Sequence, residues 1–205
     1  MIDLKIIIGI TGGIASGKSN VCSVISKLGY EIIDSDLISK ELSQKGMPVY
    51  NAIIKEFGSS YLDQEGNIDR KKLGFLIFNN SESRERLNNI SHPLILEEIK
   101  DRIMKSRRNL IFLDIPLLFE AKFTYLCDKI ICVYVEKETQ IERLMQRDNI
   151  NYEYALSKIN SQMSLEEKKK MSDYVIDSSG TFEQTKEKVY NLLKEIKGEE
   201  HGSVN

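Results

Sequence analysis

The sequence predicts an α/β fold in which a parallel sheet of five strands is covered by helices. Five apolar runs of strand length alternate with helical patterns, an order typical of parallel sheets with helical crossovers. The first run, Leu4–Ile10, leads directly into a glycine-rich loop. A later run, Asn109–Asp114, ends in an aspartate. Ligands bind beyond the carboxyl ends of such strands, so both features are expected at one edge of the sheet.

The loop Gly12–Ser19 matches G-x-x-x-x-G-K-[ST], which makes the predicted sheet one of the P-loop NTPase type. Its glycines let backbone amides approach an anion, and the start of the next helix adds partial positive charge. Lys18 is expected to reach the β- and γ-phosphates of a nucleotide, and the Ser19 hydroxyl to hold Mg²⁺. The helix follows from Val21 to Leu28 and is expected to stop at Gly29.

The second strand, Tyr30–Asp34, leads into an Asp-Ser-Asp sequence. A carboxylate at the exit of a parallel strand can face a transferred phosphate, which favours a catalytic role. Aspartate also caps helices, and Asp36 directly precedes a helical pattern that starts near Leu37. Spacing does not separate the two roles, and different aspartates can fill them.

Residues 37–106 show no clear strand pattern and are too long for a simple crossover, so we expect a helical insertion. Helices are predicted over 37–42, 49–57, 71–78 and 82–90. Pro93 suits the first turn of a further, separate helix. His92 is more often a packed or capping residue at such a position than a substrate contact.

Four apolar residues before Asp114 give a Walker-B-like strand, which predicts a carboxylate near Mg²⁺. The apolar loop Ile115–Glu120 follows it and is expected to form a pocket wall. A fourth strand is predicted over Lys129–Val135 and a fifth over Tyr174–Asp177, before a last amphipathic helix.

The helix Lys137–Asp148 has an apolar stripe and a polar stripe that carries Gln140, Arg143 and Arg147. Arginines near a nucleotide neutralise charge on the transferred phosphoryl group, although a solvated helix face explains the same spacing. Two more short helices, over 151–160 and 164–171, complete what we predict to be a mobile lid. The Lys168–Lys170 run within it is expected to be a solvated face rather than a phosphate site, although one of these lysines could contact phosphate.

Composition excludes some classes of protein. The 205 residues suit either one large domain or a core with insertions, and a net charge of −2 gives no basic field for nucleic acid. No apolar run has the length of a membrane span, and no secretory signal is expected. The three cysteines, Cys22, Cys127 and Cys132, form no C-x-x-C pair and indicate reduced thiols in the cytoplasm.

The motifs together resemble dephospho-CoA kinases in identity and order from about Ile6 to Gly180. They are the phosphate loop from Thr11, Ile33-Asp34-Ser35-Asp36, His92-Pro93, the Asp114–Glu120 segment, Gln140-x-x-Arg143-x-x-x-Arg147-Asp148, Gln162-Met163 and Asp173–Asp177. The resemblance implies ATP-dependent phosphorylation of the ribose 3′-hydroxyl of dephospho-CoA. It further implies a core over 1–36, 107–136 and 172–198, an acceptor-binding region over 37–106 and a lid over 137–171. The polar residues 199–205 are expected to form a frayed tail.

By this resemblance Asp36 is the general base, and His92, Pro116, Leu117 and Leu118 line the acceptor site. Ser19 and Asp114 hold Mg²⁺, and Lys18, Arg143 and Arg147 act on the phosphates. The implied ATP-binding set is Gly13, Ile14, Ala15, Ser16, Gly17, Lys18, Ser19, Asn20, Arg143 and Arg147. Dephospho-CoA is the implied partner, with no nucleic acid or membrane, and the sequence does not distinguish a monomer from a homo-oligomer.

The chain departs from the usual pattern of the family at four positions. Ala15 stands where glycine is usual, Asn20 where threonine is common, Ser35 where alanine is usual and Ser178 where asparagine is frequent. Ala15 is expected to be tolerated only if its φ is negative. Ser178 puts the adenine contacts in question.

Two alternative functions stay open at this point. A kinase of a nucleoside or nucleoside monophosphate would carry a similar loop and similar arginines. A GTPase-type switch should carry N-K-x-D, which the sequence lacks. The Asp63–Gly66 segment fits D-x-x-G, but it follows no strand and is predicted to be a turn.

Overall fold

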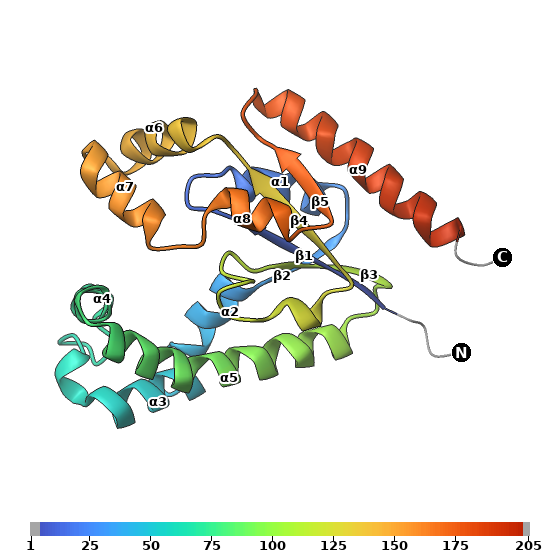
Figure 1. Cartoon of the computed structure of the whole chain (residues 1–205). Coiled ribbons are helices and arrows are strands. Elements are labelled where there is room, and N and C mark those ends of the chain that lie inside the picture. The colour runs from blue at the N-terminus through green and yellow to red at the C-terminus, as the bar shows by residue number, and fades with distance from the viewer. Residues whose placement is uncertain (1–4, 203–205) are drawn as a thin grey trace. The chain divides into compact units, whose positions relative to one another are not determined.

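The computed structural model describes residues 5–202, with side chains through residue 198, and contains the predicted five-stranded sheet (Figure 1). The strand order is β2-β3-β1-β4-β5. β1 pairs in parallel with β3 and with β4, and β4 pairs in parallel with β5, so the predicted fold class is confirmed. The strands are β1 Ile6–Gly12, β2 Glu31–Asp34, β3 Leu110–Asp114, β4 Lys129–Tyr134 and β5 Tyr174–Asp177.

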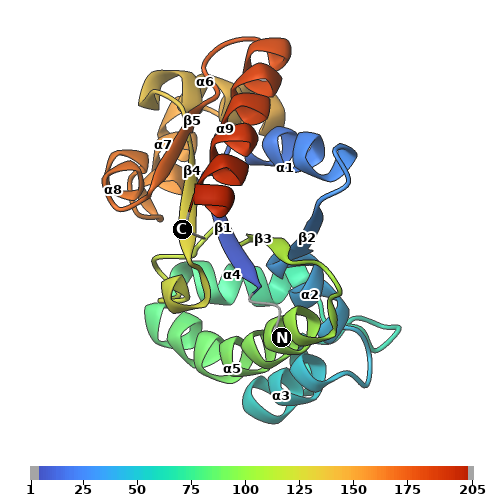
Figure 2. The same cartoon turned by 90° about the vertical axis from the view of Figure 1, so that its right-hand side faces the viewer.

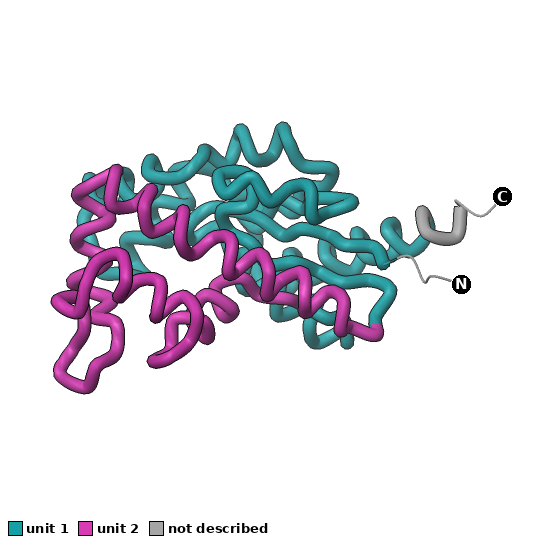
Figure 3. The backbone as a smooth tube through the Cα atoms, turned by 90° about the horizontal axis from the view of Figure 1, so that it is seen from below, with its two compact units in different colours: residues 1–32, 108–205 teal, residues 33–107 magenta. Residues whose placement is uncertain are grey.

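The chain forms two compact units, coloured separately in Figure 3. The first unit holds residues 1–32 and 108–205, and the second holds residues 33–107. The insertion expected over 37–106 falls within the second unit. No helix among residues 5–202 combines the length and apolar composition that crossing a membrane requires.

The core of the first unit lies between the sheet and helices α1 (Lys18–Lys27) and α9 (Phe182–Gly202). α9 packs against α1 and β5 (Figure 2). Ile8 and Ile10 of β1 have no exposed surface, as expected of a central parallel strand. Gly29 follows α1 with φ of 85°, a conformation that glycine adopts without strain at a helix end. Of the tail predicted over 199–205, residues 203–205 lie outside the described residues, and the backbone of α9 continues to Gly202.

Three short helices follow β4: α6 (Lys137–Asp148), α7 (Tyr152–Asn160) and α8 (Leu165–Lys170). α6 and α7 share an apolar cluster of Ile141, Leu144, Ala155 and Ile159. Local signals start the next two helices, because Asn151 caps α7 and Ser164 forms a capping box on α8. α8 packs against β4 and β1.

The second unit consists of helices α2 (Ser35–Leu42), α3 (Pro48–Phe57), α4 (Arg70–Asn79) and α5 (Ser81–Lys105). The prediction that one helix ends near residue 90 and another begins at Pro93 is wrong, because α5 is continuous and Pro93 lies inside it. An internal proline costs roughly 3 kcal/mol. α5 packs against α2, α3 and α4 and buries Ile95 and Ile99, and this packing offsets the cost.

The Asp63–Gly66 segment is a turn, as predicted. Gly66 N donates to Asp63 O at 3.1 Å, and Asp63 Oδ1 accepts hydrogen bonds from Glu65 N and Asn67 N. The D-x-x-G match therefore has a purely local explanation.

The three cysteines are free thiols. Cys22 and Cys132 are buried in core clusters, where they pack as small apolar residues. Burial raises the pKa of the Cys132 thiol to about 11 and that of Cys127 to about 12. Cys127 and Cys132 are thus placed as packing groups rather than as reactive thiolates.

Candidate active site

The phosphate loop connects the end of β1 to the first turn of α1. Gly17 precedes α1 with φ of 84°, and Ser16 N donates to Gly13 O at 3.1 Å within the loop. A Cβ atom on Gly12 would lie 2.6 Å from Ser16 Oγ and 3.0 Å from Val133 O, so the tight curl requires glycine there. Asn20 lies exposed in the first turn of α1.

Ala15 has φ of 58°, so the expectation of a negative φ is wrong. The left-handed conformation costs a residue with a Cβ atom roughly 1–2 kcal/mol. Ile14 and Ala15 pack against the apolar cluster of α6 and α7, and this burial compensates for the strain. The tertiary contact therefore decides a backbone conformation that the residue type disfavours.

The buried hydroxyl of Ser16 indicates whether the loop is suited to hold an anion. Its side chain is 1% exposed, and among the described residues its Oγ is the buried side-chain oxygen without a hydrogen-bond partner. Leaving a buried hydroxyl unpaired costs roughly 1–3 kcal/mol. A phosphate oxygen held in the loop would supply an acceptor, so the loop suits a nucleotide tail.

Lys18 and Asp114 form an ion pair beside the loop. The register of β1 and β3 sets Asp114 opposite Ile10, and both members of the pair are largely buried. The other carboxylate oxygen of Asp114 accepts from Cys22 Sγ at 3.3 Å. The Asp114 carboxylate and the hydroxyl of Ser19, exposed on α1, are oxygen ligands of the kind that Mg²⁺ prefers.

The two arginines of α6 have different surroundings. Arg143 Nη2 donates to Ser178 O at 2.8 Å, and the Ser178 hydroxyl donates in turn to Ser16 O, so Arg143 lies beside the loop. Arg147 instead pairs with the neighbouring Asp148 at 2.8 Å and is about half exposed. Hydrogen bonds from Arg147 and then Lys158 lower the pKa of Asp148 to about 2.

The two aspartates after β2 are also distinct. Asp34 Oδ1 accepts from Asp36 N at 2.8 Å and from Leu37 N at 3.0 Å, so Asp34 is the cap of α2. The alternative that Asp36 caps this helix is wrong. Asp36 lies in the first turn of α2 with an exposed side chain.

The remaining predicted substrate residues differ in exposure. His92 lies on α5, and burial lowers its pKa. In the loop after β3, Leu117 is 41% exposed and Leu118 has no exposed surface. Pro116 O accepts from the Thr11 hydroxyl at 2.9 Å, which fixes this loop to the end of β1.

Sequence reasoning missed Lys168, whose side chain has no exposed surface. Its Nζ donates to Pro116 O at 2.8 Å and to Gly12 O at 3.3 Å, and it pairs with Glu120 at 2.9 Å. The prediction of a solvated face is wrong for Lys168 and correct for Lys169 and Lys170, which are exposed. Lys168 follows the apolar Leu165 by three residues, and this spacing could have indicated that both side chains lie on the inner face of α8.

We expect Lys168→Met to lower the free energy of unfolding by about 3 kcal/mol, because it removes a fully buried ammonium group together with its bonds to Pro116 O, Gly12 O and the partly exposed Glu120. Chemical denaturation of the variant and the wild type measures the difference. Lys170→Met removes the same charge from the exposed side of α8 and should change stability by less than about 0.5 kcal/mol. Equal effects of the two substitutions would show that the buried contacts of Lys168 carry no stability.

The parallel sheet, the phosphate loop and the Lys18–Asp114 pair define a nucleotide-binding protein of the P-loop class. In fold the chain is similar to the shikimate kinase from Acinetobacter baumannii in complex with shikimate, with a TM-score of 0.53 at 17% identity over 96% of each chain. A likeness at this identity concerns the fold alone.

Sequence similarity then identifies the family. The model of the dephospho-CoA kinase family matches residues 6–184. A dephospho-CoA kinase of Bacillus cereus is 46% identical over 194 residues, which cover 93% of this chain and 97% of the relative. The structure of the dephospho-CoA kinase from Campylobacter jejuni is similar with a TM-score of 0.70 at 33% identity, covering 96% of this chain and all of that one. The chain belongs to the dephospho-CoA kinase family.

Proposed function

We propose that this protein transfers the γ-phosphoryl group of ATP to the ribose 3′-hydroxyl of dephospho-CoA, which yields coenzyme A and ADP. The main support for this proposal is a complete phosphate loop with Lys18 beside Asp114, in a chain that belongs to the dephospho-CoA kinase family. The reduced thiols favour a cytoplasmic reaction, and we assign the protein no nucleic-acid or membrane partner.

The phosphate loop holds the nucleotide in this proposal. Backbone amides of residues 13–20, with Lys18, bind the triphosphate, and the Ser16 hydroxyl gains the partner that it lacks. Ser19 and Asp114 would hold Mg²⁺, which neutralises charge on the β- and γ-phosphates when bound. Lys18 would then exchange its pairing with Asp114 for the phosphates.

The acceptor hydroxyl is activated by Asp36. Asp36 lies exposed in the first turn of α2, directly after the exit of β2, where a carboxylate can face a transferred phosphate, whereas the carboxylate of Asp34 caps the helix. We assign acceptor binding to the region 37–106, His92 included, and to Pro116 and Leu117. Leu118 is fully buried and acts by fixing the loop that carries these two residues.

Residues 137–171 act as the lid, with arginines that neutralise the phosphoryl group during transfer. Arg143 already lies beside the loop through its contacts with Ser178. Arg147, which is about half exposed, would leave Asp148 for the phosphates, and Asp148 would keep its pairing with Lys158 at 2.9 Å. Closure over ATP excludes the water that would otherwise hydrolyse it.

We expect ADP release with ATP and dephospho-CoA, and no release above background with nucleosides or nucleoside monophosphates. A coupled ADP assay over this acceptor panel measures it, and NMR of the product locates the new phosphate on the 3′-oxygen. Turnover with a nucleoside monophosphate alone would support the other kinase class. A preference for GTP over ATP in the same assay would support a guanine-specific protein.

A further inference from the structure

The backbone of Ile14, inside the phosphate loop, is held by two glutamine side chains. Gln140 Nε2 of α6 donates to Ile14 O at 2.7 Å. Ile14 N donates to Gln162 Oε1, in the connection between α7 and α8, at 3.2 Å. The two bonds fix successive peptide groups of the loop, and both glutamines come from the 137–171 segment.

Gln140 is committed to this contact. The sequence predicts it on a polar stripe with Arg143 and Arg147, yet its side chain is 4% exposed, so it does not belong to a solvated face. A buried amide without a partner is costly, and this one reaches the loop backbone. A Cβ atom on Gly13 would lie 2.6 Å from Gln140 Nε2 and 3.1 Å from Leu165 Cγ, so Gly13 permits the close approach.

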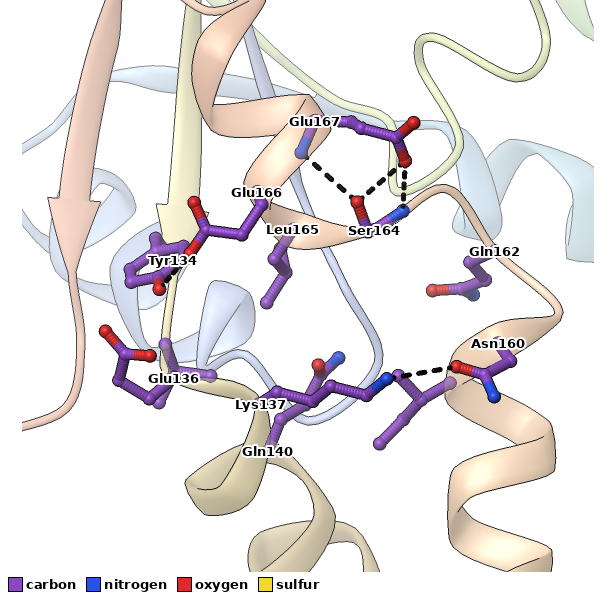
Figure 4. Close-up of a pocket in the computed structure, with 12 residues that line it drawn as sticks. Tyr134, Glu136, Lys137, Gln140, Asn160, Gln162, Ser164, Leu165, Glu166 and Glu167 are labelled. Atoms are coloured by element: carbon purple, nitrogen blue, oxygen red, sulfur yellow. Dashed lines mark hydrogen bonds between the residues drawn. The ribbon is translucent and has the colours of Figure 1, made fainter.

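Gln140 and Gln162 also lie at the wall of a cavity of about 460 Å³, which is lined by residues of β4, α6, α7 and α8 and of the connections between them (Figure 4). A further contact of the 137–171 segment with the phosphate loop is apolar. The Ile14 side chain packs against the apolar cluster of α6 and α7. The 137–171 segment thus contacts the phosphate loop at Ile14 through both hydrogen bonds and apolar packing.

We infer that Gln140 and Gln162 are positioning residues that hold the phosphate loop in its binding shape. Ile14 directly precedes Ala15, whose φ of 58° is disfavoured and persists only where neighbours enforce it. Without the two bonds, Ala15 can relax and the amides that follow it turn away from the phosphates. This inference rests on the proposed function, because it assigns a role in ATP use.

The polarity of the two bonds provides the test. Gln140→Glu replaces a donor by a carboxylate that faces the carbonyl oxygen of Ile14. Gln162→Glu keeps an acceptor for Ile14 N. We expect kcat/KM for ATP to fall about 10²-fold in Gln140→Glu and about threefold in Gln162→Glu, since displacements near 1 Å cost about 10²-fold. Gln162→Met removes the acceptor, and its kcat/KM for ATP should lie between the values of these two variants.

Gln146→Glu is the matched control, because it adds the same charge on an exposed position of α6 and should retain wild-type rates. If Gln140 and Gln162 only filled space, Gln140→Glu and Gln162→Glu would be equally active. That result, or a Gln140→Glu enzyme within about threefold of wild type, overturns the inference. If Gln140→Glu does not fold, as judged by thermal unfolding, Gln140→Met replaces it with an expected loss of about tenfold.

Binding of a fluorescent ATP analogue separates this inference from the proposed function. If wild type binds the analogue but does not phosphorylate dephospho-CoA, the proposed acceptor is wrong. Even in that case, Gln140→Glu should weaken binding of the analogue most, Gln162→Met less and Gln162→Glu least. Equal binding by Gln140→Glu and Gln162→Glu would overturn the positioning role whatever the acceptor.

Discussion

Lys18→Ala is expected to lower kcat/KM for ATP by at least about 10³-fold, the loss typical when a charged group is removed from a developing transition-state charge. Lys18 is the cation that begins α1 at the end of the phosphate loop, and it already pairs with the buried carboxylate of Asp114. Its removal takes away the attraction to the β- and γ-phosphates. It also leaves Asp114 without its cation, so a fall in stability is expected as well.

Initial rates of ADP release measure this effect, and thermal unfolding separates it from loss of fold. Lys27→Ala is the matched control, because Lys27 lies exposed in the last turn of the same helix. The control should retain wild-type rates. Near-normal turnover by a folded Lys18→Ala protein would contradict the assignment of the loop as the site of phosphoryl transfer.

Asp36→Asn is expected to lower kcat by about 10²- to 10⁴-fold and to leave KM for ATP nearly unchanged. The substitution keeps the size of the side chain and removes its capacity to accept the hydroxyl proton. The fold should be retained, because Asp34 supplies the capping bonds of α2. A selective fall in kcat is the signature of an interaction made in the transition state rather than in ATP binding.

Asp34→Asn provides the comparison within the same three residues. Asparagine keeps a side-chain oxygen for Asp36 N and Leu37 N, so this variant should retain the cap and kcat within about twofold of wild type. If Asp36→Asn retains a normal kcat, or if Asp34→Asn is the slower enzyme, Asp36 is not the base.

Local sequence determined much of this protein. Strand patterns, the G-x-x-x-x-G-K-S loop and the aspartate after the third strand depend on residues that are close in the chain. Backbone geometry then fixes their spacing in space, because parallel strands end at one edge of a sheet. The sheet and the ends of most helices follow the sequence prediction for this reason.

Tertiary structure decided what depends on partners distant in the chain. Gln140 and Lys168 read as surface residues by helical spacing, and both are buried because acceptors from β1, the phosphate loop and the loop after β3 meet them. Packing likewise keeps α5 continuous through Pro93 and holds Ala15 at positive φ. In each case the free energy gained from buried contacts exceeds the local conformational preference of the residue. Which residues become buried is set by the packing of the whole chain rather than by neighbouring residues.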